Sequence, residues 1–148
     1  MQVLLLTVMI YAFVLPVVEI FAGAYVMRNT NDPALVAFYQ LAIYCGIVTT
    51  SLVNGLLLKF INVKVIYSGG ILVSALSLGG MMMVKCLGLV ELGLAGFLLG
   101  AASGFFWTNR YLLSLYNTTD SNRNYYFGLE SFFFSVANIT VPLVIGAF

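Results

Sequence analysis

Three charged side chains lie inside otherwise apolar stretches of the sequence: Glu19, Arg110 and Glu130. A charge in such surroundings is costly and therefore usually has a function or a partner. Arg110 lies seven residues before the polar segment 117–123, and Glu130 lies seven residues after it. If that segment joins two antiparallel helices, both charges lie at the same depth, roughly 10 Å from the loop at ~1.5 Å per residue. This spacing predicts a buried Arg110–Glu130 pair, which either locks two helices together or forms part of a substrate or proton pathway.

Trp107 and Asn109 belong to the same apolar stretch as Arg110. Aromatic rings beside a few amides suit a cavity for a small polar organic solute such as a sugar. The alternative is an interfacial aromatic belt, with amides that join helices. Glu19 is either a proton or substrate ligand or a hydrogen-bonded carboxyl near the interface. We take Glu19, Trp107, Asn109, Arg110 and Glu130 as candidates for a substrate or coupling-ion pathway.

Three glycines, Gly96, Gly100 and Gly104, recur at intervals of four residues just before these candidates. Small residues at this spacing share one helix face and allow a second helix to approach closely, as in many membrane helix pairs. The pattern predicts that the glycines serve helix packing.

Several function classes are disfavoured by composition. The sequence has no histidine, and its two cysteines, Cys45 and Cys86, lie far apart, so we expect no metal site and no cofactor. The acidic residues are scattered, which argues against an enzyme. A net charge of +1 without a basic patch argues against nucleic acid as a partner.

The hydrophobic content identifies the chain as an integral membrane protein whose surroundings are a lipid bilayer. Of its 148 residues 62% are hydrophobic and only 7% are charged, against roughly a quarter in soluble domains. Uncharged runs cover residues 1–18, 33–58, 65–84, 92–109 and 131–148, each close to the ~18–20 residues that span a hydrocarbon core. The predicted fold is all-α, a single transmembrane domain over residues 1–148. Its helices are expected at about 3–27, 34–58, 65–84, 89–116 and 124–148.

Basic residues in the loops indicate an orientation. With the N-terminus inside, the inner loops hold Lys59, Lys64 and Arg123, while the outer loops hold Arg28 and Lys85. This bias favours an N-terminus in the cytoplasm, and we expect a bacterial inner membrane.

The segment between the expected second and third helices holds Gly55, Lys59 and Lys64, and with them it resembles the most recognisable motif of the major facilitator superfamily of transporters. That motif is a glycine followed by an acidic-basic cluster, and Gly55, Lys59 and Lys64 fit it. Leu58 stands where the family has an aspartate. Gly96 to Gly104, and the Tyr126-Phe127-Gly128 triplet after a polar loop, also resemble the family's passage from helix four to helix five.

The resemblance implies helices one to five of twelve, with the first and fourth beside a central cavity that Glu19, Trp107, Asn109 and Arg110 would border. It also implies secondary active transport by alternating access, with the remaining helices of the same transporter as partners. An odd number of helices and a last helix that runs to Phe148 suggest a truncated chain. The alternative function is a non-catalytic membrane scaffold or assembly subunit that binds partner helices through its glycine-rich faces.

Overall fold

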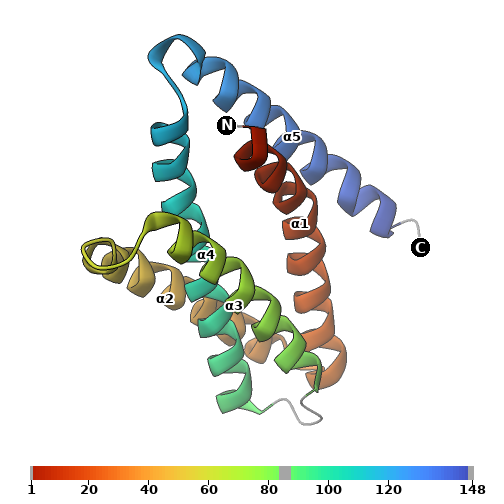
Figure 1. Ribbon diagram of the computed structural model, residues 1–148. Coiled ribbons are helices and arrows are strands. Elements are labelled where there is room, and N and C mark those ends of the chain that lie inside the picture. Colours follow the sequence, from red (N-terminus) through yellow and green to blue (C-terminus); the bar gives the residue numbers. More distant parts are fainter. Residues whose placement is uncertain (1, 84–87, 147–148) are drawn as a thin grey trace. The chain divides into compact units, whose positions relative to one another are not determined.

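The computed structural model describes residues 2–83 and 88–146, which form helices joined by short connections (Figure 1). The helices are α1 (Gln2–Thr30), α2 (Pro33–Leu57), α3 (Val63–Met83), α4 (Leu89–Asn117) and α5 (Asp120–Gly146). All five are long and apolar enough to cross a membrane. The predicted all-α membrane class is therefore confirmed. The expected helix ends at residues 84 and 148, together with Lys85 and Cys86, lie outside the described residues.

The largest difference from the expected boundaries is at the start of α5, which begins at Asp120 instead of residue 124. The polar residues there serve as a helix start rather than as a loop. The Asn122 side chain accepts a hydrogen bond from the Thr119 amide at 2.8 Å, and the Arg123 side chain pairs with Asp120 at 2.9 Å. An acidic residue in a first turn also suits the positive end of the helix dipole.

The connection between α1 and α2 is a single tight corner. α1 continues to Thr30, and Asn31 adopts the left-handed conformation (φ 50°) that asparagine tolerates at a helix end. Asp32 then caps α2, because its carboxylate accepts the amide of Ala34 at 2.8 Å. Pro33 follows as the first residue of α2, a position where its missing N–H has no cost.

The helices form two compact units. The first, called here the α2–α4 unit, comprises Tyr25–Leu112. The second, the α1/α5 unit, comprises the residues up to Ala24 and those from Leu113 onward.

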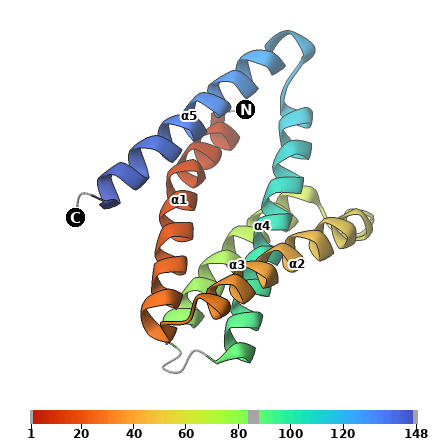
Figure 2. The same ribbon diagram turned by 180° about the vertical axis from the view of Figure 1, so that it is seen from behind.

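In the α2–α4 unit, α4 is the most enclosed helix. In its most apolar stretch 44% of the residues are buried, against 11–28% in the other four helices. α3 crosses one side of α4 (Figure 2), where a methyl group on Gly70 would come within 3.0 Å of the Ala102 carbonyl oxygen. Phe106 stacks on Tyr67 of α3 with ring centroids 5.2 Å apart, and α2 packs on another side of α4.

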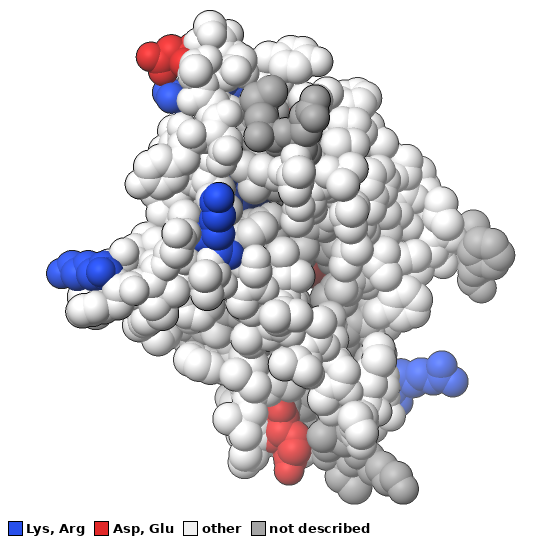
Figure 3. Space-filling model, in the orientation of Figure 1, with Lys and Arg blue, Asp and Glu red and all other residues white. Residues whose placement is uncertain are grey.

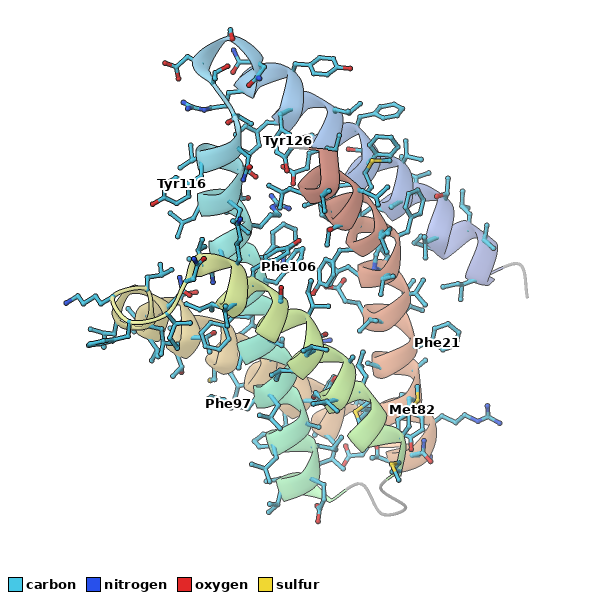
Figure 4. The ribbon with its side chains drawn as sticks, in the orientation of Figure 1. Phe21, Met82, Phe97, Phe106, Tyr116 and Tyr126 are labelled. Carbon is cyan, nitrogen blue, oxygen red and sulfur yellow. The ribbon has the colours of Figure 1, made fainter. Side chains whose placement is uncertain are left out.

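In the α1/α5 unit, the N-terminal part of α1 lies beside α5 (Figures 1 and 2). Small and medium side chains, Val8, Ala12 and Ala137, are fully buried in it. Tyr126, labelled in Figure 4, is buried too, and its hydroxyl accepts a hydrogen bond from Ser114 at 3.3 Å.

The surface suits lipid rather than water. Large apolar side chains such as Leu52, Leu76 and Leu143 are exposed. On the face shown in Figure 3 the charged side chains are few and stand apart on an uncharged surface. An exposed apolar surface of this extent is expected where a bilayer is the solvent.

Candidate functional site

α2 and α4 touch backbone to backbone through the three glycines Gly96, Gly100 and Gly104. A methyl group at Gly96 would lie 2.8 Å from the Tyr39 carbonyl oxygen. At Gly100 it would overlap the carbonyl group of Ile43, and at Gly104 it would overlap the hydroxyl of Thr50. All three glycines therefore face α2, with no space for a side chain between the helices.

α2 supplies a matching glycine at the same crossing. A methyl group on Gly46 would overlap the Phe97 carbonyl oxygen and come within 2.8 Å of the Ala101 amide nitrogen. Sequence reasoning missed this residue, although a signal was present: Ala42, Gly46 and Thr50 recur at intervals of four, so α2 also carries a stripe of small side chains.

Beyond the crossing, two buried amides connect the helices. The Asn109 side-chain nitrogen donates to the Asn54 side-chain oxygen at 2.8 Å and to its own helix at the Phe105 carbonyl, also at 2.8 Å. Asn109 is 0% exposed and Asn54 is 1% exposed. Sequence reasoning did not single out Asn54, because a separation of 55 residues along the chain gives no local sign of contact.

Arg110 lies against two aromatic rings of its own helix. Its guanidinium carbon is 4.2 Å from the centre of the Trp107 ring and 4.6 Å from that of Tyr111. The side chain is only 4% exposed. A cation on aromatic faces gains electrostatic attraction, more so when both are removed from water. Trp107, Asn109 and Arg110 thus lie within about one turn of α4.

A groove of about 470 Å³ lies between the C-terminal parts of α2 and α4. It adjoins the Thr50–Gly104 contact. Its walls come from Ser51, Asn54 and Gly55 of α2, from Leu58 directly after α2, and from Trp107, Thr108, Tyr111 and Leu112 of α4. Hydroxyl and amide groups are therefore set among aromatic and aliphatic surface, a common composition for small-molecule sites.

The residues of the predicted loop motif lie in two different settings. Gly55 is part of α2 and lines the groove. Lys59 and Lys64 are exposed, Lys59 in the turn that follows α2 and Lys64 in the first turn of α3. The Asn62 side chain accepts the Lys64 amide at 3.0 Å and so starts α3.

The two acidic candidates belong to the α1/α5 unit. Glu130 is 3% exposed and lies one helical turn after Tyr126, whereas Glu19 is exposed on α1. Arg110 belongs to the other unit, so its pairing with Glu130 stays a prediction.

No protein-family model, curated protein or solved structure matches this chain. Its function must therefore be argued from the residues themselves.

The buried amide pair yields a quantitative prediction. Replacing Asn109 by leucine leaves the Asn54 oxygen buried without its donor, and we expect a loss of about 1–2 kcal/mol in unfolding free energy. Replacing both asparagines by leucine should recover part of this loss, because neither polar group is then left alone. A double-mutant cycle, measured by unfolding the purified chain in mixed micelles, gives the coupling energy. A coupling energy near zero would contradict the hydrogen bond.

Proposed function

We propose that this chain is the N-terminal portion of a secondary active transporter, of the major facilitator type, for a small polar organic solute. The observation that carries the proposal is the buried polar cluster of Asn54, Asn109 and Arg110 within membrane-length helices. Burying an amide or a guanidinium at such a position is unfavourable, and intramembrane polar residues typically mark solute or ion pathways. Glu130, buried in the α1/α5 unit, adds a second charge with the same significance.

The contacts that the glycines of α4 make within the chain disfavour the scaffold alternative. A scaffold would present its glycine stripe to partner helices, whereas Gly96, Gly100 and Gly104 already contact α2 of the same chain. That face of α4 has no room for a further helix.

The energy source and the orientation form part of the proposal. The sequence has no glycine-rich phosphate-binding loop, so transport is driven by a solute or ion gradient. We place the N-terminus in the cytoplasm of a bacterial inner membrane, where Lys59, Lys64 and Arg123 face the inside. Alternating access would then rock these helices against the remaining helices of the same transporter.

An uptake assay tests the proposal. The intact gene product that contains this chain is reconstituted in proteoliposomes, and a panel of radiolabelled sugars, polyols, amino acids and organic acids is offered with and without an imposed proton or sodium gradient. We expect at least one solute to accumulate above the level reached without a gradient. Absence of uptake for the whole panel, together with copurification of a stoichiometric membrane partner, would reject transport in favour of the scaffold.

A further inference from the structure

We propose that the groove between the C-terminal parts of α2 and α4 is a binding site for a small neutral hydroxylated solute, of the sugar or polyol class. The proposal rests on the proposed transport function, because it identifies the chemistry of the solute carried. Its evidence is separate, and comes from polar groups in the groove whose hydrogen bonds are incomplete.

Thr108 differs from the other helical threonines. Five of them donate their hydroxyl to the carbonyl oxygen four residues earlier, at 2.7–2.8 Å: Thr7, Thr30, Thr49, Thr50 and Thr140. Thr108 forms no such bond, nor any other side-chain hydrogen bond, within residues 2–83 and 88–146. In an apolar setting a hydroxyl without a partner costs free energy, and the backbone bond was available to it. A rotamer that forgoes this bond leaves the hydroxyl free for a partner in the groove.

Two further polar groups on the groove walls have free hydrogen-bonding capacity. The Asn54 oxygen accepts from Asn109, but the Asn54 amide nitrogen donates to nothing in the described part of the chain. The Tyr111 hydroxyl likewise forms no hydrogen bond with the described residues, although its ring contacts Arg110. Asn54, Thr108 and Tyr111 thus offer amide donors and two hydroxyls, each able to donate and accept. A polyhydroxylated solute matches this mixture, because every hydroxyl of the solute can do either.

The absence of charge on the groove walls selects a neutral solute. Each of the eight wall residues is uncharged. The nearby guanidinium of Arg110 is buried against the rings of Trp107 and Tyr111 and is not among the wall residues. An ionic solute would lose its hydration here without gaining a counter-charge. The aromatic and aliphatic wall suits the apolar face of a sugar ring, and about 470 Å³ lies within the usual size of small-molecule sites.

Trp107 provides a direct readout, because it is the single tryptophan of the chain and lines the groove. The chain is placed in lipid nanodiscs, and Trp107 emission is followed while D-glucose, mannitol or sucrose is added up to about 10 mM, above the usual range of KM values. We expect a saturable change with at least one of these neutral probes and none with D-glucuronate. No saturable change with any neutral probe would overturn the proposal.

Two pairs of variants locate the binding. A methyl group on Gly55 meets no atom within 4 Å, so Gly55→Leu fills the groove without displacing neighbouring residues and should abolish the Trp107 response. The control is Gly69→Leu on α3, which is equally unobstructed and should leave the response unchanged. Thr108→Val should weaken binding about tenfold, the value of one lost hydrogen bond. Thr49→Val, whose hydroxyl bonds Cys45, should leave binding unchanged. Circular dichroism confirms that each variant is folded.

The possible results separate this proposal from the transport function. If the Trp107 response survives Gly55→Leu, the solute binds elsewhere and the groove is rejected as the site. If the response is unchanged by Thr108→Val, the Thr108 hydroxyl forms no hydrogen bond with the solute, and the groove is again rejected. Uptake that Gly55→Leu leaves intact, without any Trp107 response, rejects the groove and retains transport. Binding of a neutral probe without uptake of any solute retains the groove and rejects transport.

Discussion

Replacing Gly100 by valine is expected to separate α2 from α4 and to lower the unfolding free energy by about 3 kcal/mol or more. A methyl group at this position already overlaps the Ile43 carbonyl group, and backbone atoms cannot move aside as a flexible side chain could. The larger valine side chain would push the helices apart along the whole crossing, including the contacts at Gly96 and Gly104. Unfolding of the purified chain in mixed micelles of increasing sodium dodecyl sulfate content measures the effect.

Gly79→Val is the matched control for this experiment. Gly79 is also in the interior of a helix, but it is exposed, and a methyl group on it meets no atom within 4 Å. Both substitutions therefore change the intrinsic helix preference equally, and only Gly100→Val creates a clash. Equal stability of the two variants would mean that the α2–α4 crossing does not stabilise the fold.

Replacing Arg110 by glutamine is expected to reduce the initial rate of solute uptake about a hundredfold. The guanidinium loses its position over the rings of Trp107 and Tyr111, and each such contact is worth up to about 2 kcal/mol when removed from water. A loss of about 2.7 kcal/mol at the rate-limiting step corresponds to this factor. Uptake into proteoliposomes, normalised to the amount of folded protein, provides the measurement. Arg110→Lys should retain an intermediate rate, because a compact ammonium keeps the charge without the planar stacking.

Arg28→Gln controls for loss of positive charge in general. Arg28 is exposed in the last turn of α1, so its substitution should leave both uptake and stability unchanged. If Arg110→Gln transports as fast as the unmodified protein, Arg110 has only a packing role, and the polar cluster loses its functional interpretation.

The helices could be predicted from the sequence, because length and hydrophobicity alone decide whether a segment can span a bilayer. Charged and polar residues separate the five apolar runs, and each run lies in a helix that begins within a few residues of its expected start. The start of α5 was less predictable. Asp120 and Arg123 suggest a loop by polarity, but they also suit a first helical turn, and polarity alone does not distinguish the two.

The groove and its polar partners required coordinates. Periodicity shows that Gly96, Gly100 and Gly104 share a face, but it does not say which helix that face meets. The Asn54–Asn109 bond depends on the register between α2 and α4, which the Gly46–Gly100 contact fixes. The free hydroxyl of Thr108 depends on a rotamer. Local patterns in the chain carry information on neither register nor rotamer.

The enclosure of α4 has a consequence for biogenesis. α2 and α3 emerge from the ribosome before α4, yet the small-residue stripe of α2 and the Gly70 face of α3 both pack on α4. At synthesis rates of roughly 5–20 residues per second, both faces remain uncovered for several seconds. During that interval they are surfaces that a membrane chaperone or the insertion machinery can hold. Nascent chains arrested before residue 89 should therefore crosslink to such factors through Gly46→Cys.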